Sequence, residues 1–478
     1  MRARSLVFAA LIAPLLAADG AAQNARTATL DWINANQAKF EQSAMKIWDW
    51  AEVGYQEVQS SALLQSMLRE GGFDVQPAIA GIPTAFVASW GQGEPVVALL
   101  AEFDALPGIT QDASPRRAPI ETKGAGHACG HHLFGVGSVA AALAVREWMA
   151  NNRIAGTLRL YGTPAEEGGS GKVYIARSGA FDDVDIVLHW HASDRNDASP
   201  STSLANVSAK FRFRGLSAHA AGFPERGRSA LDGVEAMNHM VNLMREHVPQ
   251  DSRIHYVITR GGEAPNVVPD FAEVYYYARH PSGTMVQELF DRIVEAAQGA
   301  AMGTGTTVEH EIIGGVWSVL PNETLARAMD ANLRQVGGVT YDARERAFAE
   351  EIHATLPPDA AAIGTEAEIV PFREYRSGGS TDVGDVSWRV PTAGLRTATW
   401  VPGTASHSWQ AVAAGGTSIG VQGMMVAART LALTVMDVFN TPRLVADATA
   451  EFRRRLPPGF AYRPLVGDRA PPLDYRKE

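Results

Sequence analysis

Two apolar, β-rich stretches of this chain each lead into side chains that can bind a cation. Thr157–Tyr161 precedes the adjacent pair Glu166 and Glu167, and Asp185–Leu188 precedes His191. Continuous apolar runs are typical of strands buried in a parallel sheet, and open α/β sheets build their sites at the carboxyl ends of such strands. The pattern predicts an α/β protein with a site at that edge, although a Glu-Glu pair taken alone is more often a solvated turn.

Three histidines follow predicted strands. His189 and His191 fall on one face of their strand because side chains alternate, and His191 lies nearer the carboxyl edge. We therefore expect His191 to be the better ligand and His189 to be a packed core residue. His407 lies in a loop of small residues after the predicted strand Leu395–Trp400, a position that indicates little by itself.

The segment Gly126–Leu133 places Cys129, the only cysteine of 478 residues, among three histidines. A thiolate and the imidazole of His131 can point into one cavity if the backbone turns between them, and Gly130 permits that turn. The segment therefore predicts a metal site. The alternative is a buried, unreactive cysteine beside surface histidines.

Together these residues resemble the di-metal metallopeptidase and amidohydrolase family of aminoacylase, carboxypeptidase G and the auxin-conjugate hydrolases, and within it the branch of aminobenzoylglutamate hydrolases. The resemblance covers nearly the whole mature chain. It is carried by seven ordered blocks: Ala101–Pro107, His127–Gly135, Pro164–Gly168, Leu188–His191, Ser217–Ala221, Ala264–Asp270 and Gly379–Asp385.

The resemblance implies which residues form the site. The implied metal ligands are Cys129, His131, Glu167, His191 and His407. The cysteine stands where many relatives have a bridging aspartate. Glu166 matches the general base, and Asp104 matches the acid that orients a metal-bound imidazole.

One position departs from the peptidase branch of the family. Glu102 stands where those relatives have a ligand histidine, whereas the amidohydrolase branch takes that ligand from the Cys-Gly-His run. The departure favours the amidohydrolase branch. The implied cofactors are two divalent metal ions per subunit, either zinc, which a thiolate favours, or manganese, which suits carboxylates and imidazoles.

The implied reaction is hydrolysis of an amide by a metal-activated water. Glu166 would accept the proton of the water and pass it to the leaving nitrogen. His219 matches the family position that donates to the oxyanion, and in relatives this histidine comes from the partner subunit. The alternative for His219 is a capping or surface histidine.

Two further positions bear on the substrate. Asn266 and Arg279 match residues that, in relatives, hold the carbonyl and the carboxylate of an amino-acid moiety, although Arg279 can equally form a surface ion pair. We expect an N-aroyl or N-acyl amino acid, with p-aminobenzoyl-glutamate as the candidate substrate. Two alternatives are an auxin-conjugate or general N-acyl amino acid hydrolase, and a non-catalytic exported binding subunit that needs an A-type partner.

The length of 478 residues exceeds what one compact core usually holds. We expect a discontinuous catalytic domain with a mostly parallel sheet, formed by 24–202 and 321–478. Between its two parts, 204–318 has the order strand, helix, strand, strand, helix, strand, which predicts an inserted α+β, ferredoxin-like domain for dimerisation or as a lid. A homodimer is therefore expected, or a heteromer with an A-type subunit.

The two ends of the chain carry separate signals. Arg2 and Arg4 precede an apolar stretch that ends in small residues near Ala22, a pattern typical of a secretory signal peptide over 1–22. We expect a periplasmic or secreted protein without a membrane span after cleavage, although an uncleaved anchor is the alternative. A net charge of −10 argues against nucleic acid as a partner. The Pro- and Arg-rich tail 457–478 predicts an extended or partly disordered end.

Overall fold

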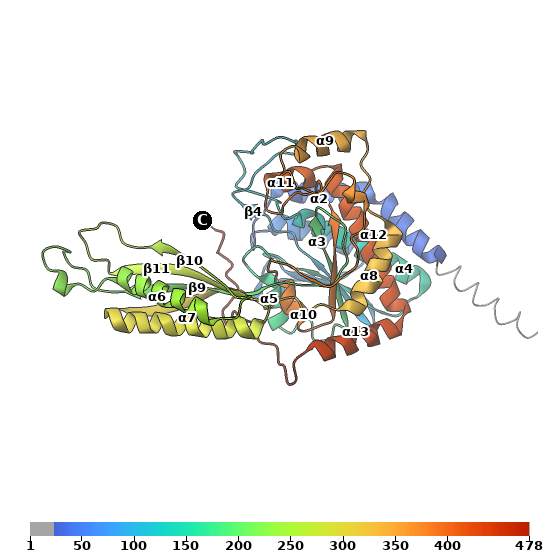
Figure 1. Cartoon of the computed structure of the whole chain (residues 1–478). Helices are drawn as coiled ribbons and strands as arrows, with labels where there is room; N and C mark the ends of the chain where they lie inside the picture. Colours follow the sequence, from blue (N-terminus) through green and yellow to red (C-terminus); the bar gives the residue numbers. More distant parts are fainter. Residues whose placement is uncertain (1–22, 478) are drawn as a thin grey trace, which may run out of the picture.

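Two separate sheets organise residues 23–477, the part of the chain that the computed structural model describes (Figure 1). One belongs to a large domain formed from both ends of the chain. The other belongs to an insert that extends to one side of the large domain. The leader expected at 1–22 lies outside the described residues.

The large domain is built on a six-stranded sheet. Its strands, in spatial order, are β1 (Asp74–Pro77), β2 (Phe86–Gln92), β6 (Gly156–Gly162), β3 (Val96–Ala101), β7 (Ile186–Ser193) and β14 (Thr392–Ala398). The last four strands are mutually parallel, and β1 and β2 form an antiparallel edge. Every residue of β3 is buried, as expected for a strand covered on both faces. The predicted α/β fold with a mostly parallel sheet is confirmed.

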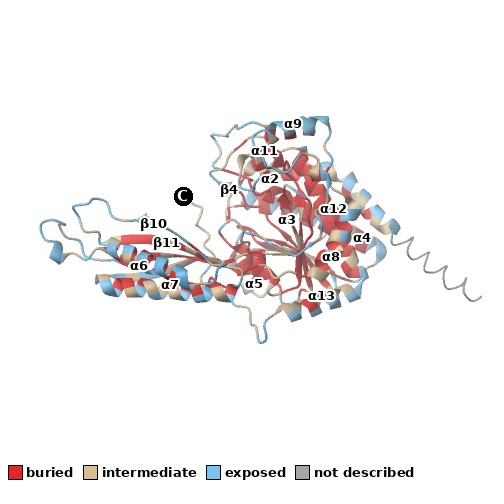
Figure 2. Ribbon diagram, in the orientation of Figure 1, coloured by how far each residue is buried: buried red, intermediate tan, exposed pale blue. Residues whose placement is uncertain are grey.

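Two long apolar helices pack on the six-stranded sheet of the large domain, and Figure 2 colours much of this region as buried. Helices α4 (His131–Asn152) and α12 (Ser418–Asn440) pack against each other, α4 covering β3 and β7 and α12 covering β14. Both are long and apolar enough to cross a membrane, and both are mostly buried inside the protein. A Cβ atom at Gly135 would lie 2.7 Å from the carbonyl oxygen of Glu102, so this glycine lets α4 approach the end of β3 closely.

The remaining helices of the large domain surround this core. They are 23–35, α2 (Gln37–Trp50), α3 (Val58–Glu70), α5 (Gly171–Arg177), α8 (Glu323–Val336), α9 (Ala343–His353), α10 (Val383–Ser387), α11 (Trp409–Gly415) and α13 (Pro442–Arg455). Two short strand pairs complete it: β4 (Leu106–Pro107) with β5 (Ala125–Gly126), and β8 (Ser201–Thr202) with β13 (Tyr375–Arg376).

The insert is a four-stranded antiparallel sheet with two helices. Its elements are β9 (Ala205–Arg214), α6 (Ala230–Met244), β10 (Arg253–Arg260), β11 (Phe271–His280), α7 (Gly283–Thr304) and β12 (Thr307–Val316). The spatial order β10-β11-β9-β12 is that of a ferredoxin-like sheet. Helices α6 and α7 bury apolar faces against it, and β10 is an edge strand with mostly exposed side chains.

The tail, for which the sequence predicts an extended surface segment or a partly disordered end, is packed against the protein in its described part. Leu465 and Val466 are buried, and Trp317 Nε1 donates a hydrogen bond to the carbonyl oxygen of Arg463 at 2.8 Å. The segment also forms turns, such as the one in which the backbone N–H of Gly467 donates to the carbonyl oxygen of Pro464 at 3.1 Å. The described part of the tail therefore packs along the protein.

Candidate metal centre

A cavity of about 390 Å³ opens in the large domain where parallel strands end. Glu102 follows β3, Glu166 and Glu167 follow β6, and His191 lies near the end of β7. All four line the cavity. The expected arrangement of side chains at the carboxyl edge is therefore present in the structure.

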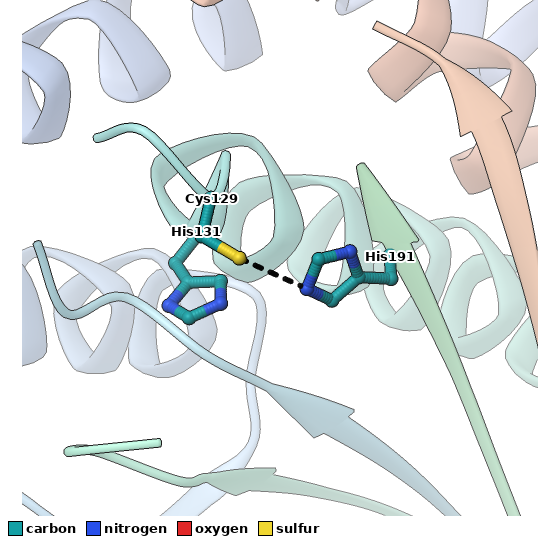
Figure 3. Close-up of side chains that lie close together, drawn as sticks. All are labelled: Cys129, His131 and His191. Carbon is teal, nitrogen blue, oxygen red and sulfur yellow. Dashed lines mark hydrogen bonds between the residues drawn. The ribbon is translucent and has the colours of Figure 1, made fainter. Parts of the chain in front are cut away.

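Cys129, His131 and His191 form the inner part of this cluster (Figure 3). One ligand atom from each lies within 4.8 Å of the others, and Cys129 Sγ is 3.5 Å from His191 Nε2. Gly130 turns the backbone between cysteine and histidine with φ of 75°, and a Cβ atom there would lie 2.3 Å from Cβ of Ala192. A glycine is therefore required for the run to approach β7.

Two more groups of candidate ligands overlap with the first. Cys129, Glu167 and His407 form one, and His131, Glu166 and Glu167 form the other. His407 belongs to a distant loop, and its backbone N–H donates to the carbonyl oxygen of Ala128 at 2.9 Å, which fixes that loop beside the cysteine run. The six residues thus offer one sulfur, three imidazole nitrogens and carboxylate oxygens around a shared space.

Several of these atoms approach one another without hydrogen bonding. His131 Nε2 lies 3.0 Å from Glu102 Oε2, and His407 Nε2 lies 2.9 Å from Glu167 Oε1. His131 Nε2, Glu102 Oε2 and Glu167 Oε1 are nevertheless buried without a hydrogen-bond partner among the described residues. Buried polar atoms rarely stay without a partner, so these nitrogen and oxygen atoms fit the role of ligands to one or more cations held between them.

Asp104 holds the imidazole of His131 from the opposite side. Its Oδ1 lies 2.9 Å from His131 Nδ1, and its Oδ2 accepts a hydrogen bond from the backbone N–H of Glu167 at 2.9 Å. Burial opposes a charged imidazole, but Asp104 raises the pKa of His131 well above its ordinary value. This contact leaves Nε2 of His131 facing the cavity.

The other two histidines of the run are structural. His127 Nε2 lies 3.0 Å from the carbonyl oxygen of Ile47, and His132 Nε2 lies 3.0 Å from that of Gly415. Burial lowers the pKa of His132 to about 3. Both rings therefore face the interior as neutral groups.

Sequence reasoning missed a buried lysine behind the site. Lys172 Nζ lies 2.6 Å from Glu102 Oε1 and 2.8 Å from Asp382 Oδ1, and all three side chains are buried. Burial would lower the pKa of Lys172, but Asp382 and Glu102 raise it above its ordinary value. The lysine therefore balances acidic charge beneath the cavity. No local pattern marks it, because Asp382 lies 210 residues away in the sequence.

Glu166 and Glu167 meet different surroundings. Glu166 lines the cavity, and burial, with Glu102 and Glu167 nearby, raises its pKa well above the ordinary value for a glutamate. A carboxyl group with a raised pKa can both accept and return a proton near neutral pH. Glu167 instead faces His407.

The expected substrate residues lie in two places of the insert. Arg279 is at the base, where its Nη1 donates to Oγ of Ser380, a residue of the cavity wall, at 3.4 Å. His219 and Asn266 are at the tip, outside the strands of the insert, and neither lines the cavity. Because the ten residues of β9 span roughly 30 Å, His219 lies far from the metal cluster of its own chain.

A second arginine, not expected from the sequence, lines the cavity itself. Arg396 lies on β14, opposite His191 in the parallel ladder, and its guanidinium donates to the hydroxyl of Tyr375. Among the described residues, no carboxylate lies within ion-pairing distance of Arg396. The cavity therefore has a cluster of acidic and imidazole groups at one part of its wall, and Arg396 beside Tyr375 and Asp197 at another.

Comparison with known proteins identifies relatives over most of the chain. The model of peptidase family M20/M25/M40 matches residues 98–410. The chain is 41% identical over 451 residues to the B-type chain of p-aminobenzoyl-glutamate hydrolase of Escherichia coli (strain K12), covering 89% of this chain and 94% of that protein. It is 31% identical over 426 residues to Xaa-Arg dipeptidase of Mus musculus, covering 86% and 88%.

A shorter match joins the chain to the other component of the same bacterial hydrolase. It is 30% identical over 282 residues to the A-type chain of p-aminobenzoyl-glutamate hydrolase of Escherichia coli (strain K12), covering 56% of this chain and 62% of that protein.

Solved structures share the fold. An aminobenzoyl-glutamate utilization protein from Klebsiella pneumoniae has a TM-score of 0.58 at 18% identity, covering 86% of this chain and 98% of that chain. The YXEP protein of Bacillus subtilis, described as a dinuclear metal binding peptidase, has a TM-score of 0.56 at 17% identity, covering 85% and 99%.

Proposed function

Because this chain belongs to peptidase family M20/M25/M40, it is a hydrolase that acts on amide bonds, and we propose that its substrate is an N-aroyl or N-acyl amino acid. The first candidate is p-aminobenzoyl-glutamate. One observation carries the proposal: a cavity that combines overlapping groups of metal-binding side chains with the guanidinium of Arg396 in its wall.

We propose that Cys129, His131, Glu167, His191 and His407 hold two divalent metal ions, zinc or manganese. The overlap of the three ligand groups supports two ions, because Cys129, His131 and Glu167 each belong to more than one group. When bound, the ions would polarise the substrate carbonyl and make water more acidic.

Glu166 is the proposed general base. Its carboxylate accepts a proton from water, the oxygen of that water adds to the carbonyl carbon, and the carbon–nitrogen bond then breaks. Glu166 returns the proton to the leaving nitrogen, so one water is consumed and no other reactant is required. Asp104 supports this chemistry indirectly, because it fixes both the ring of His131 and the backbone of Glu167.

The charge of the cavity supports an acidic leaving group. Arg396 lines the wall, and Arg279, which is not among the lining residues, donates to Oγ of Ser380 in the wall at 3.4 Å. Guanidinium groups pair with carboxylates in a fork geometry, so an acidic amino acid such as glutamate fits a wall that carries Arg396 better than a neutral one does. The same cations disfavour a substrate with an arginine side chain, such as the name of the Mus musculus relative describes.

A second copy of the chain is the proposed partner for the tip of the insert. The edge strand β10 exposes Tyr256, Val257 and Ile258 at 37, 55 and 40% of their surface. Phe223 and Val267, also at the tip, are 52 and 47% exposed. Unpaired, apolar strand edges favour pairing with another chain, and a homodimer would let His219 reach a neighbouring site. An A-type chain is the alternative partner.

Metal analysis and a substrate panel test the function on the purified chain alone. The panel contains p-aminobenzoyl-glutamate, its aspartate analogue, an indoleacetyl amino acid and an Xaa-Arg dipeptide. We expect two ions per chain, loss of activity on chelation, and the highest kcat/KM for the glutamate conjugate. A metal-loaded chain that is inactive until an A-type chain is added would instead support a binding role.

We also propose that the chain is exported to the periplasm or secreted, from the basic and apolar pattern of 1–22. Amino-terminal sequencing of the protein from its native host tests this proposal. A mature chain that begins near Ala22 would support export, and an intact amino terminus would contradict cleavage.

A further inference from the structure

The loop that carries Glu166 and Glu167 has an unusual backbone. Ala165 and Ser170, on either side of the pair, have φ values of 57°, and Gly168 between them has φ of 89°. Residues with a side chain rarely adopt this left-handed conformation, and they persist in it only when surrounding contacts hold them. The position of the two carboxylates therefore depends on what holds the loop.

Three contacts from the large domain hold part of the loop. Glu57 Oε1 accepts a hydrogen bond from the backbone N–H of Ala165 at 2.8 Å, and Asp104 Oδ2 accepts from that of Glu167 at 2.9 Å. Tyr55 Oη donates to the carbonyl oxygen of Gly169 at 2.7 Å. None of these contacts holds the carbonyl group of Glu167.

The end of the chain supplies that contact. Tyr475 Oη and Arg476 Nη2 both donate to the carbonyl oxygen of Glu167, at 2.9 and 3.1 Å. The ring of Tyr475 packs edge-on against Tyr55, with ring centres 5.7 Å apart. A Cβ atom at Gly54 would lie 2.2 Å from Tyr475 Oη, so the absence of a side chain there makes room for the hydroxyl.

The tail that leads to Tyr475 is anchored along its length. Arg177 donates to the carbonyl oxygens of Gly467 and Arg469, both at 2.8 Å. Gln56 Nε2 donates to that of Leu473 at 2.9 Å, two residues before Tyr475. The tail therefore arrives at the loop with little freedom.

We propose that Tyr475 and Arg476 are positioning residues for the metal centre. They fix the peptide that follows Glu167, and through it they hold the side chain of Glu167 toward His407 while Glu166 faces the cavity. The inference rests on the proposed metal-dependent function. It predicts that a change far away in the sequence, 308 residues from Glu167, weakens metal binding and turnover together.

The test uses the full chain loaded with zinc. Tyr475→Phe removes the hydroxyl and keeps the ring, Arg476→Met removes the guanidinium, and the double variant removes both donors. Lys477→Met is the matched control, because within residues 23–477 Lys477 forms an ion pair only with the exposed Asp474 of the same tail. The measurements are the rate of zinc loss to a chelator, kcat and KM for the glutamate conjugate, and the melting temperature of the metal-free chain.

We expect the double variant to lose zinc about tenfold faster than the wild-type chain and to have a lower kcat with little change in KM. Arg476→Lys, which keeps a cationic donor, should be affected less than Arg476→Met. The control should match the wild-type chain. Unchanged zinc loss in the double variant, even with a lower melting temperature, would show a merely structural tail and overturn the inference. A wild-type chain that holds zinc but cleaves no conjugate would contradict the proposed substrate, and the rate of zinc loss would still decide whether Tyr475 and Arg476 position the metal centre. A chain that binds no metal would overturn the proposed function and this inference together.

Discussion

Glu166 and Glu167 are adjacent in sequence, yet their carboxylates meet different surroundings. Glu166 lies among buried acidic groups in the cavity wall, whereas Glu167 contacts His407 and takes part in two of the three ligand groups. A strand end allows this because neighbouring side chains point in different directions. One residue can therefore handle a proton while the other holds a cation.

The pair gives the first prediction. Glu166→Gln should keep its metal and lower kcat by about a hundredfold to ten-thousandfold, because the amide cannot accept the proton of water. Glu167→Ala should lose metal. Elemental analysis and steady-state kinetics on both variants check this, and a metal-free Glu166→Gln beside a fully loaded Glu167→Ala would reverse the two roles.

The guanidinium of Arg396 in the cavity wall gives the second prediction. Arg396→Met should lower kcat/KM for p-aminobenzoyl-glutamate by about tenfold to a hundredfold, mainly through KM, because a charged hydrogen bond to the substrate is lost. The diamide of the same substrate lacks the carboxylates and should be affected much less. Arg443→Met, on the exposed face of α13, is the control. Equal losses for both substrates would exclude carboxylate binding by Arg396.

At the scale of elements, Asp385 of α10 links the large domain to the tail. Its Oδ1 accepts from Tyr462 Oη at 2.7 Å, and its Oδ2 accepts from the backbone N–H of Trp317 at 3.0 Å. Burial raises the pKa of Asp385 to about 7, although the hydrogen bond from Tyr462 lowers it, and the nearby carboxylate of Asp382 adds to the increase.

This burial gives the third prediction. Between the ordinary pKa of an aspartate and about 7, the folded chain holds a proton that the unfolded chain has lost, so stability falls as pH rises through that window. Asp385→Asn cannot ionise, and its amide can still pair with both neighbours, because its oxygen can accept from the N–H of Trp317 and its NH2 group can donate to Oη of Tyr462. Its melting temperature relative to the wild-type chain should therefore increase from pH 4 to pH 8. The exposed Asp474→Asn serves as control, and a pH-independent difference would contradict a raised pKa.

Local patterns of apolar residues predict some strands and some residues of the site, but not all of them. Apolar runs mark β6 and β7, and because parallel strands end at one edge, Glu166, Glu167 and His191 could be expected together. The roles of Lys172 and Tyr475 could not be predicted from the sequence, because their partners Asp382 and Glu167 lie 210 and 308 residues away. Their side chains belong to no periodic pattern, and only the folded chain brings them together.

At the scale of the whole molecule, the metal cluster and the tip of the insert lie in separate parts of one chain. His219 lies at the tip, its Nδ1 accepts from the backbone N–H groups of Ala221 and Gly222 at 3.2 and 3.0 Å, and its Nε2 is left to face outward. The adjacent edge strand β10 is unpaired on one side within the four-stranded sheet. A second copy that pairs along this edge could bring its own His219 toward the cavity of the first.

This arrangement gives the last prediction. His219→Ala and Glu166→Gln chains should each be inactive as homodimers, because each dimer lacks one of the two groups at both sites. When the chains are mixed under conditions that allow subunit exchange, a mixed dimer has one site with wild-type Glu166 and wild-type His219. Activity should therefore return, to about a quarter of the wild-type value if exchange is random, since half of the dimers are mixed and each has one intact site.

Mixing Glu166→Gln with Glu167→Ala is the control, because both changes lie in the same site and no mixed dimer has a complete one. A mixture of His219→Ala and Glu166→Gln that exchanges subunits and stays inactive, or a wild-type enzyme that is active as a monomer, would show that His219 does not act across a dimer.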